Sequence, residues 1–478
     1  MNDRLSRLDP SEARGKRLLF VTGSLAHEAV SRMVDAASKQ YGFKYSIAKL
    51  PITVAALMTG KWVLKHLRID DSFDYIVLPG HLRDDAAMIA QSAGVAVLIG
   101  PKDVRDLYEL FGAAAANDYD GSYRIEIIAE INHAPRLSID ELVSQSLRLC
   151  EQGADVIDIG CDPATRWERI GEAIEALREK NIRCSIDTFD IWEASRAVRS
   201  GAELVLSVNA SNREAAIDWG SEVVVVPDGD GDWMASIDAT VEYLAGSNIR
   251  FRIDPILDPI GCGFASSIER YREVRRRYPE IGTMMGIGNV TELTDVDSAG
   301  VNVVLLAICE ELGVTSVLTT QVINWARSSV RECDLARRLT HFAVQHGLPP
   351  KRVDPRLVML RDPKLVYHPP EYFESLAATI RDNNYRIFVD ASEIHVISAG
   401  IHIRGIDPFA MMEQLMAMPQ SSNVDASHAF YLGFELNKAL TALQLGKRYE
   451  QDVALSWGML TGQQEHRRLK RGHRRRGP

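Results

Sequence analysis

The sequence predicts an α/β protein whose centre is a closed (β/α)8 barrel, the TIM barrel. Eight short apolar runs, each followed by a helical pattern, fill about 220 residues, and this is the size of such a barrel. The runs are rich in Val, Ile and Leu, as in parallel strands that are buried on both faces. A doubly wound open sheet would also alternate strands and helices, but eight such units in a row favour a sheet that closes into a barrel.

The predicted barrel strands follow one another at regular intervals between residues 122 and 345. They are 125–131, 154–160, 182–187, 203–208, 222–226, 249–254, 282–287 and 314–319. The intervening helical patterns include 139–152, 167–180, 191–200, 267–277 and 296–312. We therefore expect the barrel over residues 122–345.

An N-terminal α/β domain of three layers is predicted over residues 1–121, with a Rossmann-like or flavodoxin-like arrangement. Its apolar runs are 17–23, 75–80 and 95–100, and helical patterns cover 27–40 and 84–92. The dipeptide Gly23-Ser24 follows the first run. It fits either an anion-binding helix N-terminus or a tight strand-to-helix turn.

A C-terminal α+β domain is predicted over residues 346–465, beyond Pro349-Pro350. Short strands are expected at 385–390, 394–398 and 401–405, and a helix at 429–445. Residues 466–478 hold seven Lys and Arg residues and no acid, which predicts a disordered, solvated basic tail.

Charge and cysteine content limit the partners and the compartment. The net charge is -10, and removing the seven positive charges of the tail leaves -17 for residues 1–465. An acidic body argues against nucleic acid as a partner. The longest apolar run, 303–309, is too short to span a membrane. Six cysteines without a CxxC pair and a polar N-terminus predict reduced thiols and a cytoplasmic location.

Polar residues end the predicted barrel strands. Asp or Asn follows seven of the eight, at Asn132, Asp158, Asp187, Asn209, Asp228, Asp254 and Asn289. One such residue would usually cap a loop or a helix, but loops that follow barrel strands converge on one rim. Carboxylates and amides together match a flat heterocycle with a guanidine-like edge and ring N and O atoms. A pterin has both features.

Three segments resemble the signatures of dihydropteroate synthases, in the same order and on the second, third and sixth strands. They are Ile157-Asp158-Ile159-Gly160, Ser185-Ile186-Asp187-Thr188 and Asp258-Pro259-Ile260-Gly261-Cys262-Gly263-Phe264. Segments 253–260, 286–293 and 425–433 more closely resemble the dihydropteroate synthase-like proteins of methanogens and methylotrophs, which add a domain at each end of a pterin-binding barrel. The resemblance to the synthases covers residues 124–345.

This resemblance implies a transferase of one-carbon metabolism in tetrahydromethanopterin biosynthesis. A 6-hydroxymethyl-dihydropterin diphosphate would be joined to an arylamine, such as a ribofuranosylaminobenzene 5'-phosphate, with loss of diphosphate. Mg²⁺ is the expected cofactor, bridging diphosphate oxygens while keeping several waters. A homodimer is expected by analogy alone.

Site residues are carried over position by position. The resemblance gives Asn132 and Asp187 catalytic roles, Asn132 as the Mg²⁺ or diphosphate ligand and Asp187 as a pterin ligand. Asn209 and Asn289 would also contact the pterin, and either Asp254 or Asp258 would be its carboxylate partner. Thr165 and Arg166 resemble the Thr-Arg pair of the family's second loop and are expected diphosphate or acceptor contacts. Where the family has Arg-x-His after the eighth strand, we expect the backbone of Thr319 and Thr320 and the side chain of Arg327 to contact the anion instead.

Two departures from the synthase pattern leave other functions open. The segment after the seventh strand, Gly288-Asn289-Val290-Thr291-Glu292, has no Lys, and the segment after the eighth has no Arg-x-His. An ordinary synthase that uses p-aminobenzoate is therefore less favoured than a variant. The alternatives are a pterin-dependent methyltransferase and a non-catalytic pterin-binding scaffold.

Overall fold

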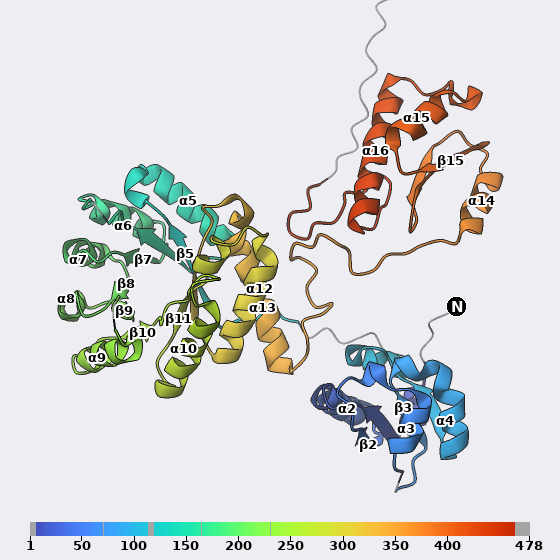
Figure 1. Ribbon diagram of the computed structural model, residues 1–478, viewed down its shortest axis with the longest axis horizontal. Coiled ribbons are helices and arrows are strands. Elements are labelled where there is room, and N and C mark those ends of the chain that lie inside the picture. Colours follow the sequence, from blue (N-terminus) through green and yellow to red (C-terminus); the bar gives the residue numbers. More distant parts are fainter. Residues whose placement is uncertain (1–5, 70, 113–118, 164, 230, 464–478) are drawn as a thin grey trace, which may run out of the picture. The chain divides into compact units, whose positions relative to one another are not determined.

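The computed structural model describes residues 6–69, 71–112, 119–163, 165–229 and 231–463. Within these ranges the strands form three sheets, each with its own helices (Figure 1). The predicted basic tail, 466–478, lies outside the described residues. Among the helices described, none is long and apolar enough to cross a membrane.

The central sheet has eight strands in the order β10-β9-β8-β7-β6-β5-β12-β11. The strands are β5 (Glu126–Ile131), β6 (Val156–Gly160), β7 (Cys184–Asp187), β8 (Leu204–Val208), β9 (Glu222–Val225), β10 (Phe251–Ile253), β11 (Met284–Gly286) and β12 (Ser316–Thr320). A parallel bridge between Ile253 and Thr283 joins β10 to the start of β11 and closes the sheet. The predicted TIM barrel is confirmed.

The barrel helices surround these strands (Figure 1). They are α5 (Ile139–Glu151), α6 (Ile170–Glu179), α7 (Ile191–Ser200), α8 (Arg213–Trp219), α9 (Trp233–Ala245), α10 (Phe264–Arg277), the short α11 (Gly288–Thr291), α12 (Ser298–Leu312) and α13 (Ser329–His346). Local sequence sets their ends, as where Ser138 and Glu141 form a capping box at α5. On α6, the buried residues Ile170, Ile174 and Leu177 recur at helical spacing and form the apolar face.

Buried aliphatic side chains from alternate strand positions fill the barrel. One cluster contains Ile128, Val156, Leu204, Leu206, Val224, Val226 and Met284. Burying each such side chain contributes about 1.5–3 kcal/mol. Because the strands are parallel, the residues that follow them come together at one end of this packed core.

The N-terminal sheet has four parallel strands in the order β2-β1-β3-β4. They are β1 (Arg17–Thr22), β2 (Lys44–Lys49), β3 (Tyr75–Leu78) and β4 (Ala96–Ile99). The helices are α1 (Pro10–Ala13), α2 (His27–Tyr41), α3 (Gly60–His66) and α4 (Ala86–Ala93). Two separate buried clusters make three layers, and this strand order is that of flavodoxin-like domains.

The turn after β1 is a tight connection, as one of the two sequence interpretations proposed. The amides of Ser24 and Leu25 donate to the carbonyls of Ile52 and Thr53, at 2.8 and 3.1 Å. A Cβ atom on Gly23 would lie 2.8 Å from the Ile52 carbonyl oxygen. These two amides therefore do not point at an anion.

The C-terminal sheet is an antiparallel meander of β13 (Arg386–Val389), β14 (Ile394–Ser398) and β15 (Ile401–Gly405). Residues Ile394, Val396 and Ile403 pack with α15 (Pro408–Met416) and α16 (Ala426–Leu445). On the opposite face, Phe388 and Ile397 pack with α14 (Pro370–Thr379). The predicted α+β character of this region is confirmed.

Candidate functional site

Asp187 ends β7, and its carboxylate is fixed from the neighbouring strand. The Ser207 hydroxyl donates to Asp187 Oδ1 at 2.7 Å. Ser207 has φ +66° at the point where the register between β8 and β9 is irregular, and such irregularities redirect side chains at barrel rims. Burial raises the pKa of Asp187, and the Ser207 hydrogen bond opposes that rise.

Asp158, on β6, is buried and close to other acids. Ser185 donates to its Oδ1 at 2.6 Å, while its Oδ2 has no hydrogen-bond partner among the residues that the structure describes. Burial, followed by the charges of Asp187 and Glu130, raises the pKa of Asp158 well above its usual range. A proton on Asp158 would favour the ionised form of Asp187 beside it, because neighbouring carboxylates repel each other.

The structure separates the two candidate carboxylates of the sixth strand. Asp254 is buried at the end of β10, where Tyr271 and the amide of Ile256 donate to it at 2.5 and 2.8 Å. Burial raises the pKa of Asp254 to about 6. Asp258 lies further along the loop and forms a 2.7 Å ion pair with Arg270. The buried position of Asp254 makes it the better candidate for a pterin ligand.

Asn289 lies beside Asp254. A Cβ atom on Gly286 would be 3.7 Å from Asn289 Nδ2 and 3.9 Å from Asp254 Oδ2, so both side chains approach this glycine at the end of β11. The Asn289 amide also donates to the Leu257 carbonyl at 2.9 Å. The Asp254 carboxylate, which accepts hydrogen bonds, and the Asn289 side-chain amide, which donates them, are thus held together at the barrel mouth.

Thr165, Arg166 and Asp187 line one cavity of about 420 Å³ at the ends of β6 and β7. Its other lining residues are Cys161, Asp162, Pro163, Thr188, Phe189, Asp190 and Glu193. Arg166 is held there by Asp190, with bonds of 2.7 and 3.1 Å from Nη2 and Nε, and its guanidinium lies over the Trp192 ring.

Four further predicted residues, Asn132, Asn209, Thr319 and Thr320, lie at strand ends, and Arg327 lies beyond β12; none of the five lines this cavity. Asn132 follows β5 and is half-buried. Asn209 follows β8, and its Oδ1 accepts from Ser211 N and Oγ, as in an Asx turn. Thr319 and Thr320 are buried in β12, and Arg327 is exposed at the end of the 3₁₀ helix Asn324–Ala326.

Several residues of the site were absent from the sequence-based prediction. Tyr271 and Arg270 on α10 hold the two carboxylates of the sixth loop. Glu193 on α7 is buried and accepts from Thr188 Oγ1 and Trp167 N. Asp190 is a further residue of this kind. It alone could be found from the sequence, because Asp directly before a helix is typical of an N-cap, and Asp190 is the N-cap of α7.

Three arginines at this end of the barrel are already paired with aspartates. They form the pairs Arg136–Asp162, Arg166–Asp190 and Arg270–Asp258. Asp162 also accepts from His133 Nδ1 at 2.5 Å. A bound anion would therefore have to compete with these carboxylates or bring its own cation.

Two segments of the chain match known protein families. Residues 131–224 match the family described as pterin binding enzyme, and residues 16–102 match a family of unknown function, DUF6513. The first match spans Asn132, Asp158, Asp187 and Asn209, and it confirms the resemblance to pterin-binding enzymes that the sequence predicted. An uncharacterized protein of Methanocaldococcus jannaschii is 26% identical, and the alignment covers 92% of this chain and 99% of that protein.

Solved dihydropteroate synthases resemble the chain distantly. The Yersinia pestis enzyme with a pterine-sulfa conjugate is 18% identical, covers 46% of this chain and 95% of its own, and has a TM-score of 0.38. The Xanthomonas albilineans enzyme with 4-aminobenzoic acid is 21% identical, covers 47% of this chain and 95% of its own, and has a TM-score of 0.39. At this low sequence identity and TM-score, the ligands of this chain have to be inferred from its own residues.

Proposed function

We propose that the barrel joins a 6-hydroxymethyl-dihydropterin diphosphate to a phosphorylated arylamine with loss of diphosphate, as a step of tetrahydromethanopterin biosynthesis. The supporting observation is the set of carboxylate and amide side chains at the mouth, within and beside the segment that matches pterin-binding enzymes. Such a set is complementary to the N–H-rich edge and the ring acceptors of a pterin.

The proposed reaction needs positioning and charge neutralisation more than acid–base chemistry. The bond between the pterin methylene carbon and the diphosphate oxygen breaks, a bond from the arylamine nitrogen to that carbon forms, and the nitrogen loses a proton. Asp187 and Asp254 would hold the ring in place, while Asn289 would donate to a ring acceptor. Fixing both reactants in this way lowers the entropic cost of the transfer.

Mg²⁺ fits the residues at the diphosphate side. Asn132 offers one amide oxygen at the end of β5, and a single protein oxygen is enough for an ion that keeps waters and binds substrate phosphates. When bound, the ion would supply charge neutralisation of the leaving diphosphate. The paired state of Arg136 and Arg166 makes such a cation more necessary.

A pterin-dependent methyltransferase is the second candidate. It is favoured by one specific observation, namely that Asn289 occupies the loop where the synthase pattern has a lysine. A methyltransferase needs no diphosphate site, so the paired arginines would be no disadvantage. A non-catalytic pterin-binding scaffold is the third candidate.

The deciding experiment gives the purified chain both substrates and measures diphosphate release together with the mass of the product. We expect Mg²⁺-dependent coupling to ribofuranosylaminobenzene 5'-phosphate and weaker coupling to p-aminobenzoate. Titration calorimetry with the dihydropterin diphosphate and with a methylated tetrahydropterin separates the alternatives. Tight binding of the methylated pterin alone would favour the methyltransferase, and binding without turnover would favour the scaffold.

A further inference from the structure

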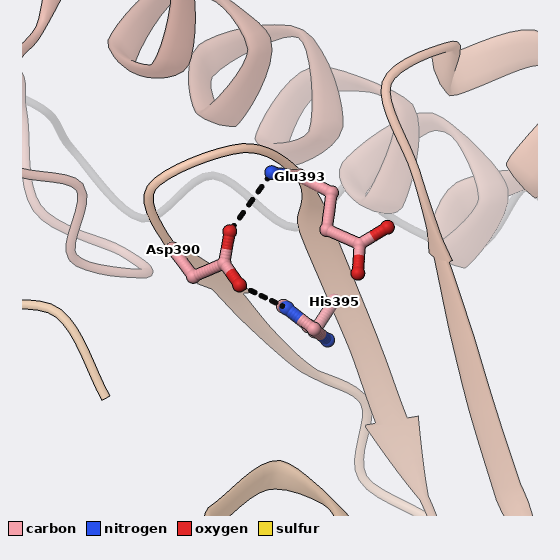
Figure 2. Close-up of side chains that lie close together, drawn as sticks. All are labelled: Asp390, Glu393 and His395. Atoms are coloured by element: carbon pink, nitrogen blue, oxygen red, sulfur yellow. Dashed lines mark hydrogen bonds and ion pairs between the residues drawn. The ribbon is translucent and has the colours of Figure 1, made fainter. Parts of the chain in front are cut away.

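A cluster of ligand-type side chains lies in the C-terminal region, outside the barrel. Asp390 and Glu393 come from the turn between β13 and β14, and His395 comes from β14 (Figure 2). Each residue offers one oxygen or nitrogen atom, and these atoms lie within 4.8 Å of one another. The pterin chemistry proposed above uses none of these residues.

We propose that Asp390, Glu393 and His395 bind a divalent first-row transition ion such as Zn²⁺. Such ions bind nitrogen and oxygen ligands at about 2.0–2.2 Å, so two ligands at ordinary coordination angles are about 3.0–3.5 Å apart. His395 Nε2 and Asp390 Oδ2 are 3.2 Å apart. An ion can therefore take a position between these two atoms, and the ligand oxygen of Glu393 lies within 4.8 Å of both.

His395 is held in one orientation, as a metal ligand usually is. Its side chain is 4% exposed, and its ring stacks on Phe373 with centroids 4.0 Å apart and an interplanar angle of 14°. Its other nitrogen, Nδ1, lies 3.1 Å from Nε2 of His402 on β15. A partner on the second nitrogen fixes the tautomer of a coordinating imidazole and its ring orientation.

Asp390 is also fixed before any ion binds. Its Oδ1 accepts from the amides of Ser392 and Glu393 at 2.7 and 2.9 Å, which leaves Oδ2 directed at His395 (Figure 2). The residue also lines a cavity of about 580 Å³.

The ligand set indicates the class of ion. One imidazole with two carboxylates suits Zn²⁺, Mn²⁺ or Fe²⁺ better than Mg²⁺ or Ca²⁺, which prefer oxygen alone. Three protein ligands leave at least one position for water. Glu393 Oε1 also lies 3.6 Å from Arg404 Nη1. Binding of the metal ion would therefore replace a weak surface ion pair of this carboxylate.

The test uses the full chain after chelator treatment, titrated with ZnCl2 by calorimetry, with bound zinc measured by mass spectrometry after gel filtration. We expect Asp390→Asn and His395→Gln each to bind one equivalent less than the unchanged protein. Asp382→Asn is the matched control, because this exposed carboxylate of the same region pairs with Arg386 and lies outside the cluster. It should retain the full stoichiometry.

Two further variants keep the proposal testable if His395→Gln fails to fold. Glu393→Gln, at a half-buried turn position, should weaken zinc binding at this site. His402→Gln should keep the stoichiometry and weaken affinity about 10–100-fold, as expected for a residue that positions a ligand. The proposal would be overturned if the zinc stoichiometry and affinity were the same in the unchanged protein and in Asp390→Asn, His395→Gln, Glu393→Gln and His402→Gln.

Discussion

The Ser207 hydroxyl donates a 2.7 Å hydrogen bond to Asp187 Oδ1 and so joins the ends of β7 and β8 at the barrel mouth. This hydrogen bond uses one of the two carboxylate oxygens of Asp187. Burial and the charges of Asp187 and Glu130 raise the pKa of the neighbouring Asp158. When Asp187 is ionised, its carboxylate can accept from the N–H groups of a flat ring.

Replacing Asp187 should remove pterin binding and leave the fold intact. A hydrogen bond to a charged group contributes about 1.5–3 kcal/mol, and two such bonds to one ring make a loss of about 100-fold or more in affinity. Titration of Asp187→Ala with the dihydropterin diphosphate measures this. Asp238→Asn is the control, because Asp238 pairs with Arg277 away from the strand ends. Unchanged affinity in Asp187→Ala would refute the assignment.

Pterin binding should weaken below pH 6 through Asp254. Burial raises the pKa of Asp254 to about 6, and only the ionised carboxylate accepts from both N–H groups of the ring edge. Affinity should therefore fall about tenfold for each pH unit below 6. The hydrogen bond from Tyr271 lowers this pKa, so Tyr271→Phe should move the midpoint upward. A midpoint that stays in place in Tyr271→Phe would assign the titration to another group.

Freeing Arg166 should improve diphosphate binding. Asp190 both caps α7, accepting from Trp192 N and Glu193 N, and pairs with Arg166. Asp190→Asn keeps a capping side chain and removes the competing charge, so affinity for inorganic diphosphate should rise several-fold, in line with the worth of a partly exposed ion pair. Calorimetry with Mg²⁺ checks this, and Arg166→Gln should show no such gain. Equal affinities in all three proteins would exclude Arg166 as an anion ligand.

The barrel was predictable because its strands are buried on both faces. Runs such as Ile127-Ile128-Ala129 have no polar alternation, so they are recognised as parallel strands without any tertiary information. By contrast, β2 (Lys44–Lys49) is an edge strand with half-exposed side chains, and its mixed composition gave no comparable signal. No strand was predicted there.

The partners within the site were less predictable than its strand ends. Asp254 and Tyr271 are 17 positions apart, and Arg166 and Asp190 are 24 apart. The first contact depends on how α10 packs against β10, and the second on how the loops after β6 and β7 meet at one cavity. Sequence periodicity specifies neither arrangement. The choice between Asp254 and Asp258 likewise depends on Arg270, whose side chain holds the loop through Asp258 and the Pro255 and Ile256 carbonyls.

The opposite end of the barrel should carry stability without function. Glu126 at the start of β5 pairs with Arg183 and Arg252 at 2.8 Å each, and Arg252 also pairs with Glu222. Burial raises the pKa of Glu126, but the hydrogen bonds from Arg252 and Arg183 outweigh it and lower the pKa overall. A lowered folded-state pKa adds stability above the unfolded value of 4.5. That stability is lost as the pH falls through the folded pKa.

Glu126→Gln should therefore unfold at a lower temperature at pH 7 than the unchanged protein, and the difference should shrink toward pH 3. Removing one partner of a deeply buried pair costs about 3–5 kcal/mol. Here Arg183 keeps contact with water and Arg252 keeps Glu222, so about 1–2 kcal/mol is expected, or several degrees in Tm. Calorimetric melting at both pH values measures this, and pterin affinity at pH 7 should not change. If Glu126→Gln instead lowered pterin affinity and left the melting temperature unchanged, this end of the barrel would serve binding and not stability.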